Sequence, residues 1–190
     1  MNLTMVMDVE SIGLWGDGFA VGWVVLDLDN PEFKLKMLQI ESCDPAYARG
    51  GNEGREWVSL NVPYNKPGFH FTHSSTRSIR ATFWDAWQEW NGKGATLWAD
   101  CGVPVEANFL RECILDGNGL RDWGGPYPLH EVDSFLLAAG VKREEHPRAY
   151  GVNKYGYAEM PEHNPVQDSI YSARLLHTAY WKLKNERLAK

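Results

Sequence analysis

The sequence predicts an α/β fold in which an antiparallel meander lies beside parallel strands, with helices on the faces of the sheet. The first 40 or so residues hold three strand-like segments separated by turn residues. After them, helix-like and strand-like segments alternate up to a long closing helix. A chain of 190 residues suits one domain with a sizeable core, so we expect a single domain over residues 1–190.

Composition narrows the class of protein. With 44% hydrophobic and 13% aromatic residues the chain is globular. No run approaches the ~18 apolar residues that a membrane helix needs, and no secretory signal is visible, so we expect no membrane partner. Cys43, Cys101 and Cys113 form no CxxC pair, which fits a reducing cytoplasm. The net charge of −6 disfavours coating duplex DNA but allows an enzyme that holds a few nucleotides around metal ions.

Three strands are predicted at the N-terminal end of the chain. Residues 5–10 form an apolar segment, residues 19–27 are rich in Val, Trp and Phe, and residues 33–40 alternate apolar and charged side chains. Glycine-containing turns separate the first two, and an Asp-Asn-Pro loop separates the last two. This spacing predicts an antiparallel meander.

The middle of the chain combines an irregular stretch with a helix. Residues 43–75 are rich in Gly and Pro, with a short strand expected over residues 57–62. Ser74-Ser75-Thr76 supplies an N-cap for a helix that Gly92 ends. The aromatic stripe of this helix is interpreted as core packing rather than a ligand site. It consists of Ile79, Phe83, Trp87 and Trp90.

The second half continues the alternation. A short buried strand over residues 95–99 ends at Asp100, and Pro104 begins a helix with an apolar face. Residues 129–132 predict a further strand, followed by a short helix through residues 133–136. Pro165 opens the long last helix.

Asp8 and Glu10 interrupt the first apolar segment. Because side chains alternate faces along a strand, both carboxylates project to one side, roughly 6.6 Å apart. Two carboxylates on a buried strand are costly unless a cation compensates them, and hard ions such as Mg²⁺ take oxygen ligands. The pair therefore predicts a metal site, and the alternative is a strand end at which both acids reach solvent.

His163 and Asp168 form a second pair near the start of the last helix. Asp168 lies in the first turns after Pro165, whereas His163 lies on the entry loop. A carboxylate on a rigid element and an imidazole of near-neutral pKa suit a metal ligand and a general base. The alternative for His163 is a surface or capping histidine.

The two pairs together resemble the DEDDh 3′→5′ exonuclease superfamily, which includes RNase T, oligoribonuclease and polymerase proofreading domains. Its first motif, Asp-x-Glu on strand 1, is matched by Asp8 and Glu10, and its third, His-x4-Asp, by His163 and Asp168. The chain looks most like the compact stand-alone exoribonucleases of bacteria and phages, over residues 5 to about 176. The resemblance implies an RNase H-like sheet.

The second motif departs from the family pattern, which has an Asp at the start of a helix in a Phe-Asp-x-x-Phe-Leu context. The matching register here, residues 105–110, puts Glu106 at the acid position. Asp100 has the expected residue type but lies six residues earlier, at the end of a strand. Glu106 is slightly favoured, and the other acid would contact the direct ligands or reach the ion through a water molecule.

The resemblance implies a two-metal hydrolase acting on the 3′ end of single-stranded RNA or DNA. Two Mg²⁺ or Mn²⁺ ions would activate the attacking water and stabilise the leaving 3′-oxygen, with His163 as general base and nucleoside 5′-monophosphates as products. Ile12, Gly13 and Leu14 would contact the terminal nucleotide. A lid over residues 148–157 would bring tyrosines onto bases and cations onto phosphates, unless this segment is a solvated loop. The lid residues are Arg148, Tyr150, Lys154, Tyr155 and Tyr157.

Two other functions remain open at this point. One is an RNase H-like binding or scaffold domain without catalysis, against which the four acids and the histidine argue. The other is a metal-dependent phosphodiesterase or nuclease that acts on small nucleotides. The sequence is also compatible with a homodimer, and it does not distinguish RNA from DNA as the substrate.

Overall fold

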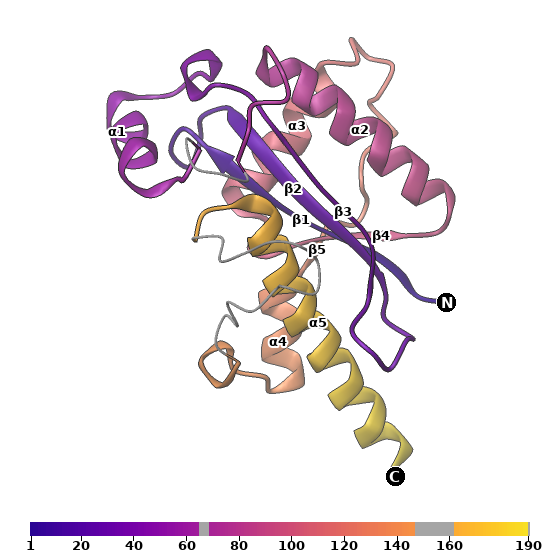
Figure 1. The fold of residues 1–190 in the computed structure, drawn as a ribbon. Coiled ribbons are helices and arrows are strands. Elements are labelled where there is room, and N and C mark those ends of the chain that lie inside the picture. Colours follow the sequence, from indigo (N-terminus) through magenta and orange to yellow (C-terminus); the bar gives the residue numbers. More distant parts are fainter. Residues whose placement is uncertain (65–68, 147–161, 190) are drawn as a thin grey trace.

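The computed structural model describes residues 1–64, 69–146 and 162–189. Within these residues a five-stranded sheet forms the centre of the molecule, in the order β3-β2-β1-β4-β5 (Figure 1). The strands are β1 (Leu3–Ser11), β2 (Gly18–Asp27), β3 (Leu35–Ser42), β4 (Thr96–Ala99) and β5 (His130–Glu131).

Strand β1 joins the two halves of the sheet. It pairs antiparallel with β2, and β2 pairs antiparallel with β3, so the first 42 residues contain the predicted meander. On its other edge β1 pairs in parallel with β4, which pairs in parallel with β5. The prediction of an α/β fold with a mixed sheet is therefore confirmed.

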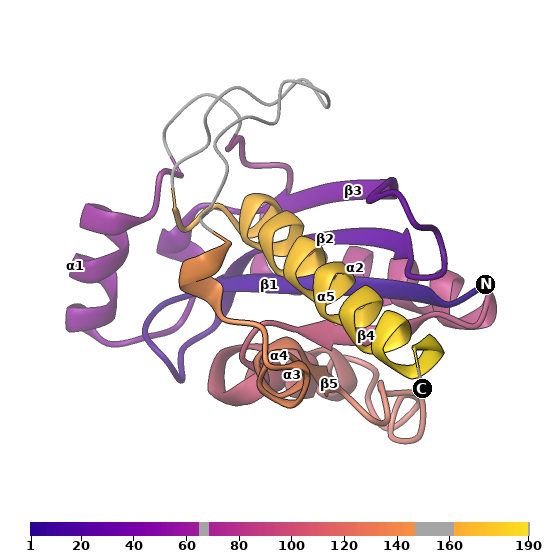
Figure 2. The ribbon, with the colours of Figure 1, turned by 90° about the horizontal axis from the view of Figure 1, so that it is seen from below.

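Helices cover both faces of this sheet. In Figure 2 the long helix α5 crosses in front of the sheet, with α2 behind it. Helix α3 packs with α2, and α4 packs with α5. The helices are α1 (Asn52–Asn61), α2 (Thr76–Gly92), α3 (Ala107–Leu115), α4 (Val132–Ala139) and α5 (Pro165–Leu188).

The alternation of side chains along β1 divides the core into two parts. Met5 and Met7 belong to the cluster on the α2 and α3 face, together with Phe83. Val6 belongs to the cluster on the α5 face, together with Ile170. Because Asp8 follows Val6 by two positions, it projects toward α5 as well.

The aromatic stripe of α2 is core packing, as the sequence predicts. Ile79 and Phe83 are fully buried and Trp87 nearly so. The ring of Phe83 lies edge-on to Trp23 of β2, with centroids 5.6 Å apart. Such a pair adds stabilisation beyond that of the buried area, so the contact between α2 and β2 helps to hold the strands of the sheet in place.

The short strand predicted over residues 57–62 is wrong, because this segment belongs to helix α1. Val58 is the buried residue of that helix. The helix therefore lacks the apolar stripe from which an amphipathic helix is predicted in a sequence. Tertiary contacts hold it instead. A Cβ added at Gly54 would lie 2.7 Å from the Gly13 nitrogen, and Arg55 Nη2 donates to the Ala48 carbonyl at 2.7 Å.

Two other boundaries differ from the prediction. The helix expected from Pro104 begins at Ala107, because an irregular turn over Gly102–Glu106 precedes it and Val103 is extended there. The short helix expected over residues 133–136 extends to Ala139, where Gly140 ends it in the left-handed conformation.

Candidate metal centre

Strand β1 carries the first two acids to the centre of the sheet. Asp8 lies opposite Gly22 of β2, and Glu10 lies opposite Ala20. Glu10 is buried, with 6% of its surface exposed, whereas Asp8 keeps more contact with solvent. Both acids therefore lie on the central strand of the sheet, as the alternation of β1 predicts.

Gly22 allows the start of α5 to approach this part of the sheet. A Cβ on Gly22 would lie 2.2 Å from the backbone nitrogen of Val166, closer than real atoms approach. Ser169 Oγ fixes the contact, because it is 3.0 Å from the Gly22 carbonyl oxygen and 2.7 Å from that of Pro165. The first turn of α5, which contains Asp168, is thus held against β1 and β2.

The entry to α5 is capped and strained in a way that places His163. Asn164 is the N-cap, its side chain accepts from the Gln167 nitrogen at 3.4 Å, and Pro165 follows it. His163 has a φ of +62°, a conformation that residues other than glycine rarely adopt. The histidine thus lies on a loop just ahead of the helix, as predicted.

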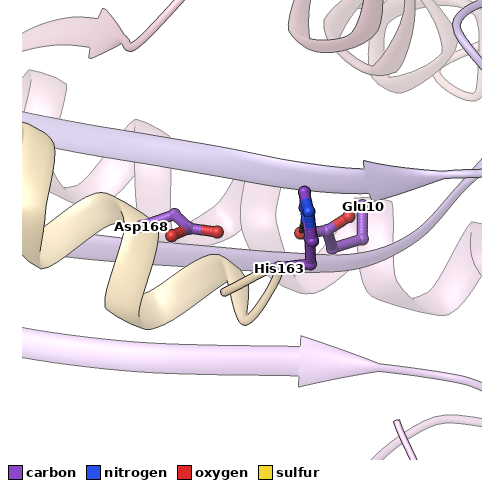
Figure 3. Close-up of side chains that lie close together, drawn as sticks. All are labelled: Glu10, His163 and Asp168. Carbon is purple, nitrogen blue, oxygen red and sulfur yellow. Dashed lines mark ion pairs between the residues drawn. The ribbon is translucent and has the colours of Figure 1, made fainter. Parts of the chain in front are cut away.

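Three of the predicted residues meet at one point (Figure 3). One ligand atom from each of Glu10, His163 and Asp168 can be chosen so that all lie within 4.8 Å of one another. The Nδ1 atom of His163 is 3.8 Å from Oε1 of Glu10. Residues from opposite ends of the chain therefore form one cluster, with the imidazole facing a carboxylate.

Asp8 belongs to the same negative region. Burial raises its pKa well above the usual value, and the neighbouring Asp168 and Glu10 raise it further. Glu106 and Asp100 contribute in the same direction. Four carboxyl groups thus act on that of Asp8, which is the situation that a bound cation relieves.

Glu106 and Asp100 differ in their surroundings. Glu106 is 6% exposed, and burial raises its pKa to about 7 although hydrogen bonds to its own backbone and that of Val9 lower it. Asp100 instead forms an ion pair with Arg143, whose Nε also donates to Asp133 at 2.7 Å. Glu106 therefore has the surroundings of a metal ligand, and Asp100 those of a carboxylate already matched by a cation.

The predicted contacts to the terminal nucleotide fall into two groups. Leu14 is 63% exposed, but Ile12 is 2% exposed, so any contact from Ile12 would come from its backbone. Gly13 between them has a φ of +69°. The lid residues Arg148 and Tyr150, like Lys154, Tyr155 and Tyr157, lie outside the described residues.

Three residues near the cluster were missed by sequence reasoning. Gly22 interrupts an apolar strand, which is a usable signal for a close backbone approach. No local sequence pattern indicates a role for Arg143 or Trp57, because both contact residues that are far away in sequence. Arg143 pairs with Asp100, and the Trp57 ring contacts His163.

The arrangement fits divalent cations. Carboxylate oxygens predominate among the potential ligands, which suits Mg²⁺ or Mn²⁺. Burial and then the neighbouring carboxylates raise the pKa of Asp8. A positive charge placed beside Asp8 would therefore favour its ionised form. Asp8, Glu10, Glu106 and Asp168 are the residues that would hold such ions.

No family model and no curated protein matches the sequence. Solved structures do match its fold. The zinc-bound complex of E. coli ExoI with single-stranded DNA has a TM-score of 0.56 at 13% identity, covering 99% of this chain and 42% of that one. A 3′-exonuclease solved for its 3′-end-specific recognition of the histone mRNA stem-loop has a TM-score of 0.57 at 13% identity, covering 97% of this chain and 82% of that one.

A full-length 3′-exonuclease is similar too, with a TM-score of 0.54 at 12% identity over 97% of this chain and 83% of that one. At these identities the likeness concerns the fold, which is RNase H-like, as the resemblance in sequence implies. The chain spans less than half the length of ExoI. Among the described residues, no helix combines the length and the apolar character needed to cross a membrane.

Proposed function

We propose that residues 1–190 form a metal-dependent 3′→5′ exonuclease domain that hydrolyses single-stranded nucleic acid to nucleoside 5′-monophosphates. The observation that carries the proposal is the convergence of Glu10, Asp168 and His163 at one point beside Asp8. The fold shared with solved 3′-exonucleases supports it. A scaffold would have no need to crowd carboxylates in this way, because their burial is costly.

In this proposal Asp8, Glu10, Glu106 and Asp168 hold two ions, Mg²⁺ or Mn²⁺. When bound, such ions lower the pKa of water and stabilise charge on phosphoryl and leaving oxygens. The carboxylates come from a sheet strand, a helix start and the first turn of α5, all of which are packed elements. Rigid elements of this kind keep the ligands in place without reorganisation during the reaction.

His163 acts as the general base on the attacking water. Its Nδ1 faces Glu10, so we assign proton acceptance to Nε2, and the carboxylate stabilises the imidazolium that forms. A bond forms between the water oxygen and phosphorus, while the bond from phosphorus to the 3′-oxygen breaks. The leaving 3′-oxygen takes a proton from solvent and becomes the new chain end.

The test is cleavage of 5′-labelled single-stranded RNA and DNA with Mg²⁺ or Mn²⁺. We expect a ladder of products shortened from the 3′ end, with nucleoside 5′-monophosphates released. A 5′-labelled substrate that is bound and stays intact with either metal would instead support the non-catalytic binding domain. Cleavage confined to dinucleotides would support a phosphodiesterase of small nucleotides.

Two variants separate the base from the ligands. His163→Ala should keep most of its Mn²⁺ affinity and lose rate by about 10²- to 10⁴-fold, the usual contribution of a general base. Asp168→Ala should lose both rate and Mn²⁺ affinity, because it removes a ligand. Calorimetry with Mn²⁺ beside single-turnover cleavage measures the two quantities. A wild-type rate in His163→Ala would contradict the proposed base.

A further inference from the structure

Helix α1 brings an aromatic ring to the loop that carries His163. The rings of Trp57 and His163 lie with centroids 4.8 Å apart and planes at 79°, an edge-to-face arrangement. This geometry is attractive because the positive edge of one ring meets the negative face of the other. The two residues are far apart in the chain, so their contact depends on how α1 is held.

Several contacts fix α1 at this place. Val58, the next residue after Trp57, is 1% exposed in the core. Gly54 packs against the backbone of Gly13, and Arg55 donates to the carbonyl oxygens of Ala48 and Pro45, the former at 2.7 Å. Trp57 itself is 44% exposed, so its ring is not required to fill the core.

His163 needs external support. Its φ of +62° lies in a region that residues other than glycine occupy only when their surroundings hold them there. Its side chain is 40% exposed, which leaves the imidazole room to turn toward solvent. Glu10 contacts one side of the ring at 3.8 Å, and Trp57 provides an aromatic contact.

We infer that Trp57 is a positioning residue for His163, and that α1 exists at this site to hold the imidazole beside Glu10. The inference rests on the proposed function for its catalytic consequence. An aromatic pair of this kind adds an amount of stabilisation that corresponds to roughly a 2- to 12-fold preference for the packed orientation. Losing Trp57 should therefore reduce the fraction of molecules whose base is in place.

The experiment compares Trp57→Ala and Trp57→Phe with Leu60→Ala, a control on the same helix at a side chain that is 77% exposed. We expect Trp57→Ala to lower kcat, by at most roughly 12-fold, with KM unchanged. Trp57→Phe should restore most of the rate, because it keeps a ring. Leu60→Ala should behave as wild type.

A double-mutant cycle separates positioning of the base from contact with the substrate. In a His163→Ala background, Trp57→Ala should cause no further loss of rate, since the group that it positions is gone. If the two losses multiply, or if Trp57→Ala raises KM and leaves kcat unchanged, Trp57 acts on the substrate and the inference is overturned.

A readout without substrate keeps the inference distinct from the proposed function. In the metal-free protein, the imidazole proton resonances of His163, assigned by their loss in His163→Ala, should shift in Trp57→Ala as the indole ring current is removed. Unchanged resonances would overturn the inference even if the protein is an active nuclease. A shift in a protein that never cleaves nucleic acid would defeat the proposed function and leave only the packing role of Trp57.

Discussion

Asp8 on β1 and Asp17 in the turn that follows are close in sequence, and burial acts to raise the pKa of each carboxyl group. The resulting pKa is nevertheless raised at Asp8 and lowered at Asp17. Arg49 donates to Asp17 from Nε and Nη2 at 2.9 Å each, and these bonds lower the pKa of Asp17 below its usual value. Around Asp8 the neighbouring Asp168 and Glu10 raise the pKa further.

The chain pairs arginines with partly buried acids at other places. Arg80, which is 5% exposed, donates from Nε to Asp116 at 2.7 Å, and Arg143 pairs with Asp100 next to the cluster itself. The crowding around Asp8 is therefore specific to that place. An internal ion pair compensates the charge of the acid from within the chain, whereas a cluster of acids is compensated only when a cation arrives from solution.

The largest effect is expected from Asp8→Asn. Removing this ligand should lower the cleavage rate on the order of 10³-fold, because metal ions supply several kcal/mol of charge stabilisation and about 1.36 kcal/mol corresponds to tenfold. Without metal the same variant should melt at a higher temperature than wild type, since one member of a repelling group loses its charge. Single-turnover cleavage and thermal melts in EDTA measure the two effects.

Addition of Mg²⁺ or Mn²⁺ should reverse this order of stability. Wild type should gain about 2.7 kcal/mol when free metal is at 100 times its Kd, whereas Asp8→Asn should gain less. An equal gain in both proteins would mean that the metal binds elsewhere.

Glu106→Gln sharpens the comparison at the second motif. A pKa raised from 4.5 to about 7 means that Glu106 destabilises the metal-free fold when it is ionised, by roughly 3 kcal/mol. Below pH about 4.5 the carboxyl is protonated in both states, so the cost is absent there and grows as the pH rises to about 7. Glu106→Gln should therefore be more stable than wild type at about pH 8 in EDTA, by urea denaturation, and similar at about pH 4.

Asp100→Asn is the matched control for Glu106→Gln. Asp100 raises the pKa of both Asp8 and Glu106, but removing its charge also takes this partner from Arg143, so the net gain in stability at about pH 8 should be smaller than that of Glu106→Gln. A gain in Asp100→Asn equal to that in Glu106→Gln would show that the two acids share the site. In that case the assignment of Glu106 as the ligand of the second motif would be withdrawn.

The sequence predicted those parts of the structure that rest on local patterns. Alternation along β1 placed Asp8 and Glu10 on one face, and Pro165 at the start of α5 placed Asp168 in its first turns. Helix α1 was missed because Val58 is its buried residue and tertiary contacts hold it. The Arg143–Asp100 pair joins residues 43 positions apart, and no local pattern reports such a contact.

Asp17→Asn should have a small effect of the opposite sign. This variant should lose about 1 kcal/mol at neutral pH, because the paired carboxylate is lost while the exposed Arg49 can be solvated. Because the folded pKa of Asp17 is lowered, its contribution is fully present above pH about 4 and disappears as the pH falls through the folded value.

The two pH profiles together decide whether the comparison holds. Urea denaturation in EDTA between about pH 3 and pH 8 should give a Glu106→Gln advantage that grows toward high pH. The same titrations should give an Asp17→Asn deficit that is lost toward low pH. Glu106→Gln could instead lose stability relative to wild type as the pH rises, as Asp17→Asn should. In that case the carboxylates at the cluster would be compensated from within the chain, as Asp17 is, and the case for an external cation would fail.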